Sequence, residues 1–452
     1  MAYFCHKLCA SDSDEPLIDW GCNPIATLTM KKVRDETCCL APWVSLRIGL
    51  SGEVFACNHN SSFLLGKYPD QSLKEIWSGK RIHKLRKHLR KNDFSLGCDI
   101  CAEDWHHHRN NAASFTLFRK YQPGSWPSML DFRLSNRCNL QCIMCSGLSS
   151  SQFGNESAQE DELFGEDFMR QLDAFIPHLQ TARFIGGEPF LIPEYYRIWE
   201  RIIDLNPQCE IVVQTNATIL NERIKELMEK GRFQISVSID SFEPQTYESI
   251  RRNASLTKVM ENLDYFSDYA QARQADMVIC FCPMRMNHHE IPDLMRYAEK
   301  RDAYICLNRF YYPAHLAIWS LPAEKIVHLR SDLANYKGSG ASEKSRINAG
   351  FLCDYIKLLA QWEDDARERV SIPFIPEKLT KLLARFNNSL SDDPVVAEKM
   401  AGIAAQVKPE QLYHYLNPIA AYYGINLFQE FLKQTNSEIV VDDIRSIKMQ
   451  AD

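Results

Sequence analysis

The chain has 452 residues, 45% of them hydrophobic, and a formal net charge of −6. This length and composition allow two or three compact units, and the negative charge argues against a protein that coats nucleic acid. No apolar run is long enough to span a membrane, and Met1 to Asp12 lack the apolar core of a signal peptide. Sixteen cysteines in a large chain of this kind favour a reducing compartment, so we expect a cytoplasmic protein.

Four cysteines near the start of the chain are spaced so that they can converge. Cys39 precedes an Ala-Pro-Trp run, Cys57 follows a short apolar segment, and Cys98 and Cys101 form a C-x2-C pair. A hairpin between the first two, followed by a helix that begins near residue 72, would bring the four thiols together. Cys38 is an alternative to Cys39, although the spacing to the Pro-Trp pair favours Cys39. Four thiolates suit both an iron–sulfur cluster and a structural zinc ion.

A basic segment at residues 80–91 has apolar residues at helical spacing, which predicts an amphipathic helix. Its charged face is interpreted either as a solvated surface or as a docking surface for an acidic partner. Both interpretations fit the residues.

Six apolar runs alternate with amphipathic segments in the middle of the chain. The runs predict strands at 130–134, 183–185, 211–216, 235–240, 277–283 and 303–307. The segments between them predict helices, among them 193–205, 221–230 and 290–300. This alternation indicates an α/β fold with a parallel sheet and right-handed crossovers, and six units form a partial (β/α)6 barrel. Ligand sites in such folds lie at the carboxyl ends of the strands.

After about residue 319 the pattern is helical, with helices expected at 322–335, 353–368 and 411–433. This C-terminal region carries no chemical motif. It can cap the barrel, select the substrate or only pack on the core. We therefore divide the chain into a cysteine-bearing domain at 1–125, a partial barrel at 126–318 and a helical region at 319–452.

Cys138, Cys142 and Cys145 follow the first barrel strand with the spacing C-x3-C-x2-C. Three thiolates from one loop can hold three irons of a 4Fe–4S cluster and leave the fourth iron open to a small molecule. A zinc site, the other interpretation, needs a fourth ligand, and the next candidates along the chain are His178 and Cys209.

These features resemble the radical S-adenosylmethionine (SAM) superfamily. The resemblance implies that SAM binds the open iron and is cleaved reductively to a 5′-deoxyadenosyl radical, which abstracts hydrogen from a C–H bond. Met144 departs from the family, which usually has an aromatic residue before the third cysteine. The Gly-Gly-Glu-Pro run and the following strand ends would hold SAM, and Arg252 fits the same role as its neighbour Arg251. The resemblance thus assigns cofactor binding to Gly186, Gly187, Glu188, Asn216, Ser238, Asp240 and Arg251.

The N-terminal cysteines resemble the twitch domain, a shortened SPASM domain, placed here before the barrel. The resemblance covers about residues 38–321, and it implies a second, auxiliary 4Fe–4S cluster on Cys39, Cys57, Cys98 and Cys101. A cluster with all four ligands would transfer electrons rather than bind substrate. The resemblance also implies an electron donor of the flavodoxin or ferredoxin type. The 80–91 segment, if it is a docking surface, would suit such an acidic donor or an acidic leader peptide.

The same resemblance implies an enzyme, but several outcomes can follow hydrogen abstraction. We expect epimerisation or oxidative modification of a ribosomally synthesised peptide, because the helical region leaves room for a large substrate. Dehydrogenation or epimerisation of a sugar or aminocyclitol is the alternative, and a non-catalytic cluster-binding protein is a third. Epimerisation needs a thiol that donates hydrogen, for which we expect Cys353, with Cys282 and Cys280 as alternatives.

Overall fold

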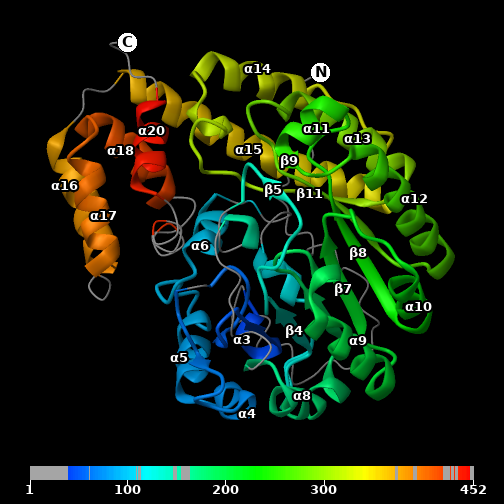
Figure 1. Ribbon diagram of the computed structural model, residues 1–452. Coiled ribbons are helices and arrows are strands. Elements are labelled where there is room, and N and C mark those ends of the chain that lie inside the picture. Colours follow the sequence, from blue (N-terminus) through cyan, green and yellow to red (C-terminus); the bar gives the residue numbers. More distant parts are fainter. Residues whose placement is uncertain are drawn as a thin grey trace.

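The computed structural model describes residues 39–60, 62–107, 109, 114–145, 150–153, 163–371, 375–389, 394–420, 428, 432 and 436–447 (Figure 1). The expectations for residues 1–12, for Cys38 and for most of the 411–433 helix after residue 420 lie outside these ranges. Within the described part of the chain, no helix is both long and apolar enough to cross a membrane.

Nine of the described strands form one large sheet, in the order β11-β10-β8-β7-β6-β4-β1-β2-β3, and β5 (Gln141–Cys142) and β9 (Arg251–Arg252) form a separate two-stranded sheet. The strands are β1 Ser45–Ile48, β2 Glu53–Phe55, β3 Gly66–Lys67, β4 Met129–Phe132, β6 Thr181–Phe184, β7 Glu210–Thr215, β8 Arg232–Ser238, β10 Met277–Phe281 and β11 Tyr304–Leu307. From β4 to β11 every neighbouring pair is parallel and follows chain order. This arrangement confirms the expected six-unit (β/α)6 sheet.

The N-terminal segment joins the same sheet. Strand β1 pairs in parallel with β4 and antiparallel with β2, so Arg47 lies between Asp131 and Phe55 in the register. Strand β3 adds a further antiparallel neighbour to β2. The hairpin expected between Cys39 and Cys57 is therefore present, and it extends the edge of the barrel sheet.

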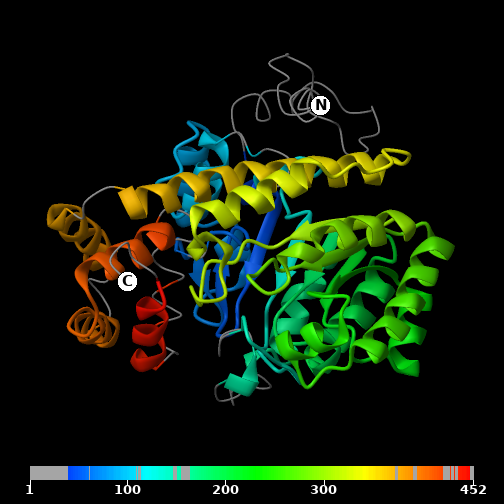
Figure 2. The same ribbon diagram turned by 90° about the horizontal axis from the view of Figure 1, so that it is seen from above.

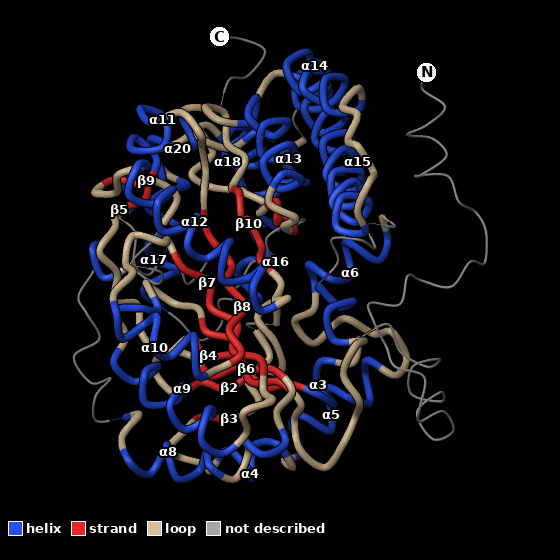
Figure 3. The backbone as a smooth tube through the Cα atoms, turned by 90° about the vertical axis from the view of Figure 1, so that its right-hand side faces the viewer, coloured by secondary structure: helices blue, strands red, loops and turns tan. Residues whose placement is uncertain are grey.

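The two faces of the sheet differ in polarity. Along β7 the buried residues Ile211, Val213 and Thr215 alternate with half-buried ones, and β8 repeats this pattern. A period of two is what a strand with one apolar face requires. Helices cover the apolar face, with α9, α10 and α12 along one side of β7 and β8 (Figure 3). The helices of this region are α8 Glu166–Asp173, α9 Pro193–Leu205, α10 Glu222–Lys230, α11 Pro244–Ile250, α12 Leu256–Arg273 and α13 Ile291–Lys300.

The N-terminal helices are short and lie in the segment that carries Cys39, Cys57, Cys98 and Cys101. They are α3 Ala41–Val44, α4 Leu73–Trp77, α5 Lys80–Leu89 and α6 Asp99–His106. Helix α4 begins at a capping box in which Ser72 and Glu75 satisfy each other's backbone N–H groups, as the Ser-x-x-Glu pattern favours. The predicted amphipathic helix at 80–91 is confirmed as α5, which buries Ile82, Leu85 and Leu89.

The C-terminal region is helical, as expected. Its helices are α14 Ala323–Ala334, α15 Glu343–Ser371, α16 Pro376–Ser389, α17 Pro394–Ala404, α18 Pro409–Pro418 and α20 Ser437–Arg445. Helix α15 is longer than the predicted 353–368 helix and lies beside α14 (Figure 2). Its Asn348 side chain accepts a hydrogen bond from Ile305 N at 2.9 Å and donates one to Ala303 O at 2.9 Å. Helix α15 therefore satisfies backbone groups of the edge strand β11, which would otherwise be free to pair with another chain.

Candidate active site

The loop with Cys138, Cys142 and Cys145 lies beyond the carboxyl end of β4. Its centre forms a two-residue strand, β5 Gln141–Cys142, which pairs antiparallel with β9 Arg251–Arg252. Ile143 N also donates a hydrogen bond to Ile250 O at 2.9 Å. Backbone pairing thus fixes the cysteine loop to the segment that follows α11.

The three thiols of this loop share one environment. Cys142 is buried, whereas Cys138 and Cys145 are partly exposed. A hydrogen bond with Cys145, assisted by the positive charge of Arg251, lowers the pKa of Cys142 to about 7, although burial opposes this shift. Burial raises the pKa of Cys138. Three thiols on one partly exposed loop are the donor set that a 4Fe–4S cluster with one open iron requires, so the residues fit this cluster.

Two glycines after β6 allow the chain to approach the cysteine loop closely. A Cβ on Gly187 would lie 2.0 Å from Arg137 O, and one on Gly186 would lie 2.4 Å from Ser135 O. Gly186 also has a φ of +134°, which side chains of L-residues rarely adopt. Gly187 N and Glu188 N donate hydrogen bonds to Ser135 O and Arg137 O, at 3.1 and 2.7 Å. The glycines therefore hold the backbone that leads into Cys138.

The Glu188 carboxylate connects the ends of β6 and β7. It accepts hydrogen bonds from Thr215 Oγ1 at 2.7 Å, Asn216 N at 2.7 Å and Phe190 N at 3.2 Å. The side chain is fully buried, and this burial raises its pKa to about 7 despite the three donors. The expected SAM ligand Glu188 thus lies beside the cysteine loop with its oxygens bonded within the chain.

Asn216 reaches the cysteine loop from the end of β7. Its Nδ2 lies 3.0 Å from Asn139 Oδ1 and 4.0 Å from Cys138 Sγ. Thr218 completes this contact, because its hydroxyl lies within hydrogen-bond distance of both Asn139 and Asn216. Sequence reasoning missed Asn139 and Thr218, although both lie within two residues of predicted site residues.

Arg251 and Asp240 form a buried ion pair beside Cys142. Nη2 of Arg251 lies 2.7 Å from Oδ2 of Asp240, and Nη1 lies 4.0 Å from the sulfur of Cys142. The other carboxylate oxygen, Oδ1 of Asp240, accepts a hydrogen bond from Cys282 N at 2.7 Å. Arg252, the other arginine considered from the sequence, is exposed. Of the two, Arg251 therefore lies at the cysteine loop.

The predicted residues Ser238 and Cys280 and an unexpected cysteine, Cys306, lie on neighbouring strands. Cys280 of β10 pairs in register with Ser238 of β8 and with Cys306 of β11. The thiols of Cys280 and Cys306 are hydrogen-bonded, which lowers the pKa of Cys306. Cys282 follows the end of β10. Cys353 on α15 is disulfide-bonded, and in that state its sulfur has no S–H hydrogen to donate.

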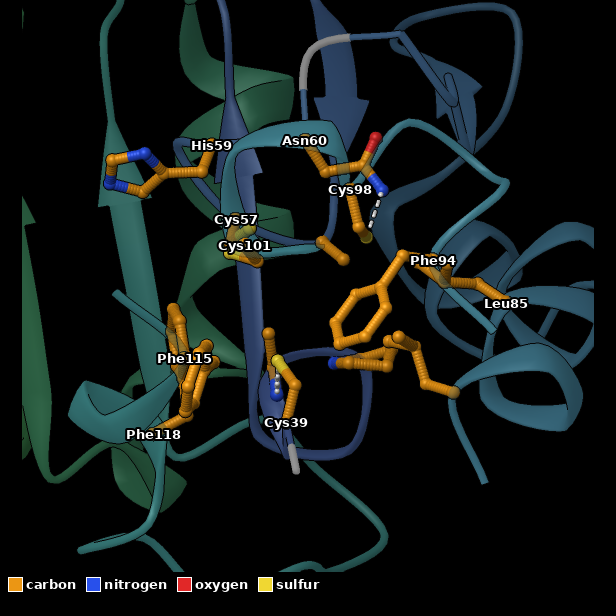
Figure 4. A pocket seen from close by; sticks show the side chains of 14 residues that line it. Cys39, Cys57, His59, Asn60, Leu85, Phe94, Cys98, Cys101, Phe115 and Phe118 are labelled. Carbon is orange, nitrogen blue, oxygen red and sulfur yellow. Dashed lines mark hydrogen bonds between the residues drawn. The ribbon is translucent and has the colours of Figure 1, made fainter. Parts of the chain in front are cut away.

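The second cysteine group gathers thiols from separate elements (Figure 4). Cys39 precedes α3, Cys57 follows β2, and Cys98 and Cys101 lie at the start of α6; all four are at most 9% exposed. The Asn60 side chain donates to Leu96 O at 2.8 Å and to Cys98 Sγ at 3.3 Å. Burial and the neighbouring thiolates Cys39, Cys57 and Cys98 raise the pKa of Cys101.

The four thiols of the second group line one cavity. Its other walls are mainly apolar and include Leu85, Leu89, Phe94, Phe115 and Phe118. Among the described residues, no three His, Cys, Asp or Glu side chains lie close enough together to hold a single metal ion. Four thiols around an apolar cavity fit a 4Fe–4S cluster.

Two family models match the regions that hold the two cysteine groups. Residues 132–298 match the radical SAM superfamily. Residues 38–102 match the SPASM iron–sulfur cluster-binding domain. The second match precedes the first along the chain, which confirms the expected order.

The curated relatives include enzymes named GTP 3′,8-cyclase. The chain is 30% identical to that of Streptomyces coelicolor over 175 residues, which cover 37% of this chain and 49% of the relative. It is 24% identical to that of Listeria monocytogenes over 323 residues, which cover 61% of this chain and 92% of the relative. The chain thus spans about half the length of the first relative. The solved structure of Streptococcus suis SuiB bound to the precursor peptide SuiA superimposes loosely, with a TM-score of 0.36 and 15% identity over 60% of this chain and 53% of SuiB.

The two family matches imply iron–sulfur clusters and SAM as cofactors and identify an enzyme. The cysteine triad and the cysteine cavity of the N-terminal segment lie within the two matched regions. Residues 132–298 therefore form a domain of the radical SAM type, and a SPASM-type cluster-binding domain precedes it in the chain.

Proposed function

We propose that this enzyme holds SAM at the Cys138, Cys142 and Cys145 site and abstracts hydrogen from a substrate on the polar face of the sheet. A 4Fe–4S cluster with bound SAM supplies reductive cleavage of SAM and a radical that removes hydrogen from carbon. The observation that carries the proposal is the attachment of the cysteine loop to the ends of β6 and β7 through Glu188 and Asn216, and to the Arg251 segment by backbone pairing.

The predicted SAM residues fall into two groups by their bonding. The oxygens of Glu188 and the carboxylate of Asp240 are bonded within the chain, so we assign Glu188, Asp240 and Arg251 as positioning residues. Gly186, Gly187, Asn216 and Ser238 lie at the strand ends around the loop and are the residues that we assign to SAM contacts.

For the substrate, we propose a ribosomally synthesised peptide that undergoes epimerisation or oxidative modification. The helices from α14 to α18 add a surface beside the barrel, which supports a substrate larger than the barrel itself holds. A small molecule is the second candidate, and the name of the GTP 3′,8-cyclases supports it. If the reaction needs a hydrogen donor, the thiols Cys280 and Cys282 are better placed than the disulfide-bonded Cys353.

We propose that a flavodoxin- or ferredoxin-type donor docks on helix α5. Leu85 and Leu89 of this helix line the cysteine cavity, so the helix separates the cavity from its own basic outer face. Lys80, Lys84 and Lys87 on that face are exposed. An acidic donor bound there would lie close to the auxiliary site.

The core proposal is tested on protein reconstituted anaerobically with iron and sulfide. The wild type should bind about eight irons and form 5′-deoxyadenosine after reduction, because each 4Fe–4S cluster holds four irons. Cys142→Ala should lose about half of the iron and all 5′-deoxyadenosine formation. Cys209→Ala, a buried cysteine outside both groups, is the control and should retain both. A reconstituted wild type that forms no 5′-deoxyadenosine would contradict the proposal.

The two substrate candidates differ in size and in sensitivity to protease. Cell extract separated by molecular mass is added to the reduced enzyme, and 5′-deoxyadenosine formation is measured. Stimulation by a peptide fraction that is lost after protease treatment supports the peptide. Stimulation by a protease-resistant, low-mass fraction supports the small molecule and rejects the peptide.

A further inference from the structure

Arg47, Asp131 and Arg183 form a row across three adjacent parallel strands. Arg47 of β1 is in register with Asp131 of β4, and Asp131 is in register with Arg183 of β6. Each is the third residue of a four-residue strand. Register partners on parallel strands point to the same face. The row therefore lies near the carboxyl ends of the strands, where ligands bind in sheets of this type.

The charged groups of the row do not satisfy one another. Arg47 is 7% exposed and Asp131 is 3% exposed. Within the described part of the chain, Nε of Arg47 and Oδ1 of Asp131 have no hydrogen-bond partner. Nε of Arg183 lies 4.0 Å from Oδ2 of Asp131, which is beyond hydrogen-bond distance. A buried guanidinium with an unused donor is costly in the absence of a further partner.

The nearby charged groups outside the row have partners of their own. Arg309 is paired with Asp104 at 2.7 Å. Glu53, another carboxylate that acts on Arg47, accepts a hydrogen bond from Ser51 N at 3.0 Å.

The row lies on the polar face of the sheet. Arg183 is in register with Val212, one of the half-buried residues of β7. At the β1 end of the row, Arg47 and Asp131 lie within electrostatic range of Cys57 of the auxiliary group. At the other end, Arg183 lies within electrostatic range of Cys280 and Cys306. A substrate of the proposed reaction would bind on this face.

We propose that the Arg47–Asp131–Arg183 row binds an anionic oxygen group, a phosphate or a carboxylate, of the substrate. Guanidinium groups present planar, paired N–H donors that match both kinds of oxygen anion. An anion at the row would accept hydrogen bonds from both arginines. The inference rests on the proposed function, because it assigns the substrate class of the same site.

The competing explanation is that the arginines only offset the negative charge of an auxiliary cluster held by four thiolates. The two explanations predict different effects of Arg183→Ala. If Arg183 binds the anion, Arg183→Ala lowers the affinity of the protein for anions. If Arg183 only offsets the charge of the auxiliary cluster, Arg183→Ala shifts the reduction potential of that cluster and leaves the affinity for anions unchanged.

The test uses the full-length protein with both clusters and saturating SAM, under anaerobic conditions. Inorganic pyrophosphate and succinate are titrated separately by calorimetry at low ionic strength. One of the two anions should bind the wild type, with a Kd that does not depend on the SAM concentration. Arg183→Ala should raise that Kd by at least about tenfold, as expected for loss of a charge-assisted hydrogen bond. Arg183→Lys keeps the positive charge, so its Kd should lie between those of the wild type and Arg183→Ala. This variant replaces Arg183→Ala in the test if Arg183→Ala does not fold.

Arg232→Ala is the matched control, because Arg232 is an exposed arginine at the amino end of β8. The Kd of Arg232→Ala for the anion should equal that of the wild type. Tighter binding of pyrophosphate indicates a phosphate-bearing substrate, and tighter binding of succinate indicates a carboxylate. Binding of neither anion, competition with SAM, or equal Kd values for wild type and the Arg183 variants would overturn the inference. The same samples are assayed for 5′-deoxyadenosine, so failure of the proposed function is seen separately.

Discussion

Arg251 and Asp240 form a buried ion pair, with 2.7 Å between Nη2 and Oδ2, and the same guanidinium lies 4.0 Å from the sulfur of Cys142. The pair therefore connects the end of β8 to the cysteine loop. Because Asp240 also accepts a hydrogen bond from Cys282 N, one carboxylate couples two strand ends to the radical site.

Asp240→Asn should destabilise the protein and loosen the cysteine loop. It leaves the buried charge of Arg251 uncompensated, which typically costs about 3–5 kcal/mol of unfolding free energy. The check is chemical denaturation of the apoprotein together with iron content after reconstitution. Arg252→Ala, which removes the exposed neighbouring arginine, is the control and should change neither quantity. Wild-type stability and iron content in Asp240→Asn would show that the ion pair does not support the loop.

Gly187→Ala should disturb the cysteine loop because no space exists for a Cβ. The new carbon would lie 2.0 Å from Arg137 O, so the backbone before Cys138 must move. We expect a loss of about 1–3 kcal/mol of stability and a lower iron content of the radical site. Gly402→Ala in α17 is a matched control, because no described atom lies within 4 Å of the position of its Cβ. That variant should be as stable as the wild type or slightly more stable. A Gly187→Ala protein with unchanged iron content would contradict the close approach.

Glu188 should make stability fall as the pH rises. Its pKa is raised by burial to about 7 in the folded protein, whereas in the unfolded chain it is near the usual value for Glu. At pH values between these two pKa values, Glu188 binds more protons in the folded state than in the unfolded state. The contribution of Glu188 to stability is therefore fully present below the unfolded pKa and is lost as the pH rises to about 7.

The measurement compares the unfolding free energy of the apoprotein with that of Glu188→Gln at several pH values. Glutamine does not titrate, so the difference between wild type and variant should decrease from about pH 5 to about pH 8. A difference that grows with pH would mean that the donors Thr215, Asn216 and Phe190 stabilise the carboxylate more than burial penalises it.

Lys87→Glu should slow reduction by an acidic protein donor. Lys87 is exposed on α5, and a reversed charge there weakens electrostatic attraction between the two proteins. The rate of cluster reduction by reduced flavodoxin should fall several-fold at low salt and approach the wild-type rate at high salt. Reduction by dithionite should not change. Lys230→Glu, an exposed lysine on α10, is the control. Equal flavodoxin rates for the two variants would place the docking surface elsewhere.

Several parts of the fold and the site were predictable because their signals are local. The alternation of buried and half-buried residues along β7 and β8 is visible in short windows of sequence, and the predicted helix 193–205 coincides with α9. The C-x3-C-x2-C spacing marks three ligands of one loop, since the backbone alone brings them together. The loop lies within residues 132–298, which match the radical SAM superfamily.

Other features depend on residues that are far apart in the chain. Arg47, Asp131 and Arg183 carry no local motif, and Cys306 becomes notable only through its register with Cys280. Nothing in the sequence distinguishes Glu188 as a carboxylate bonded to its own chain. The strand order and register decide these relationships.

Strands, helices and the cysteine loop can be predicted from the amino-acid sequence, because spacing and periodicity act within a few residues. The extension of the barrel sheet by β1, which places Arg47 beside Asp131, is seen only in the folded chain. Backbone hydrogen bonds between distant strands set which side chains meet, and no feature of either strand alone indicates that pairing.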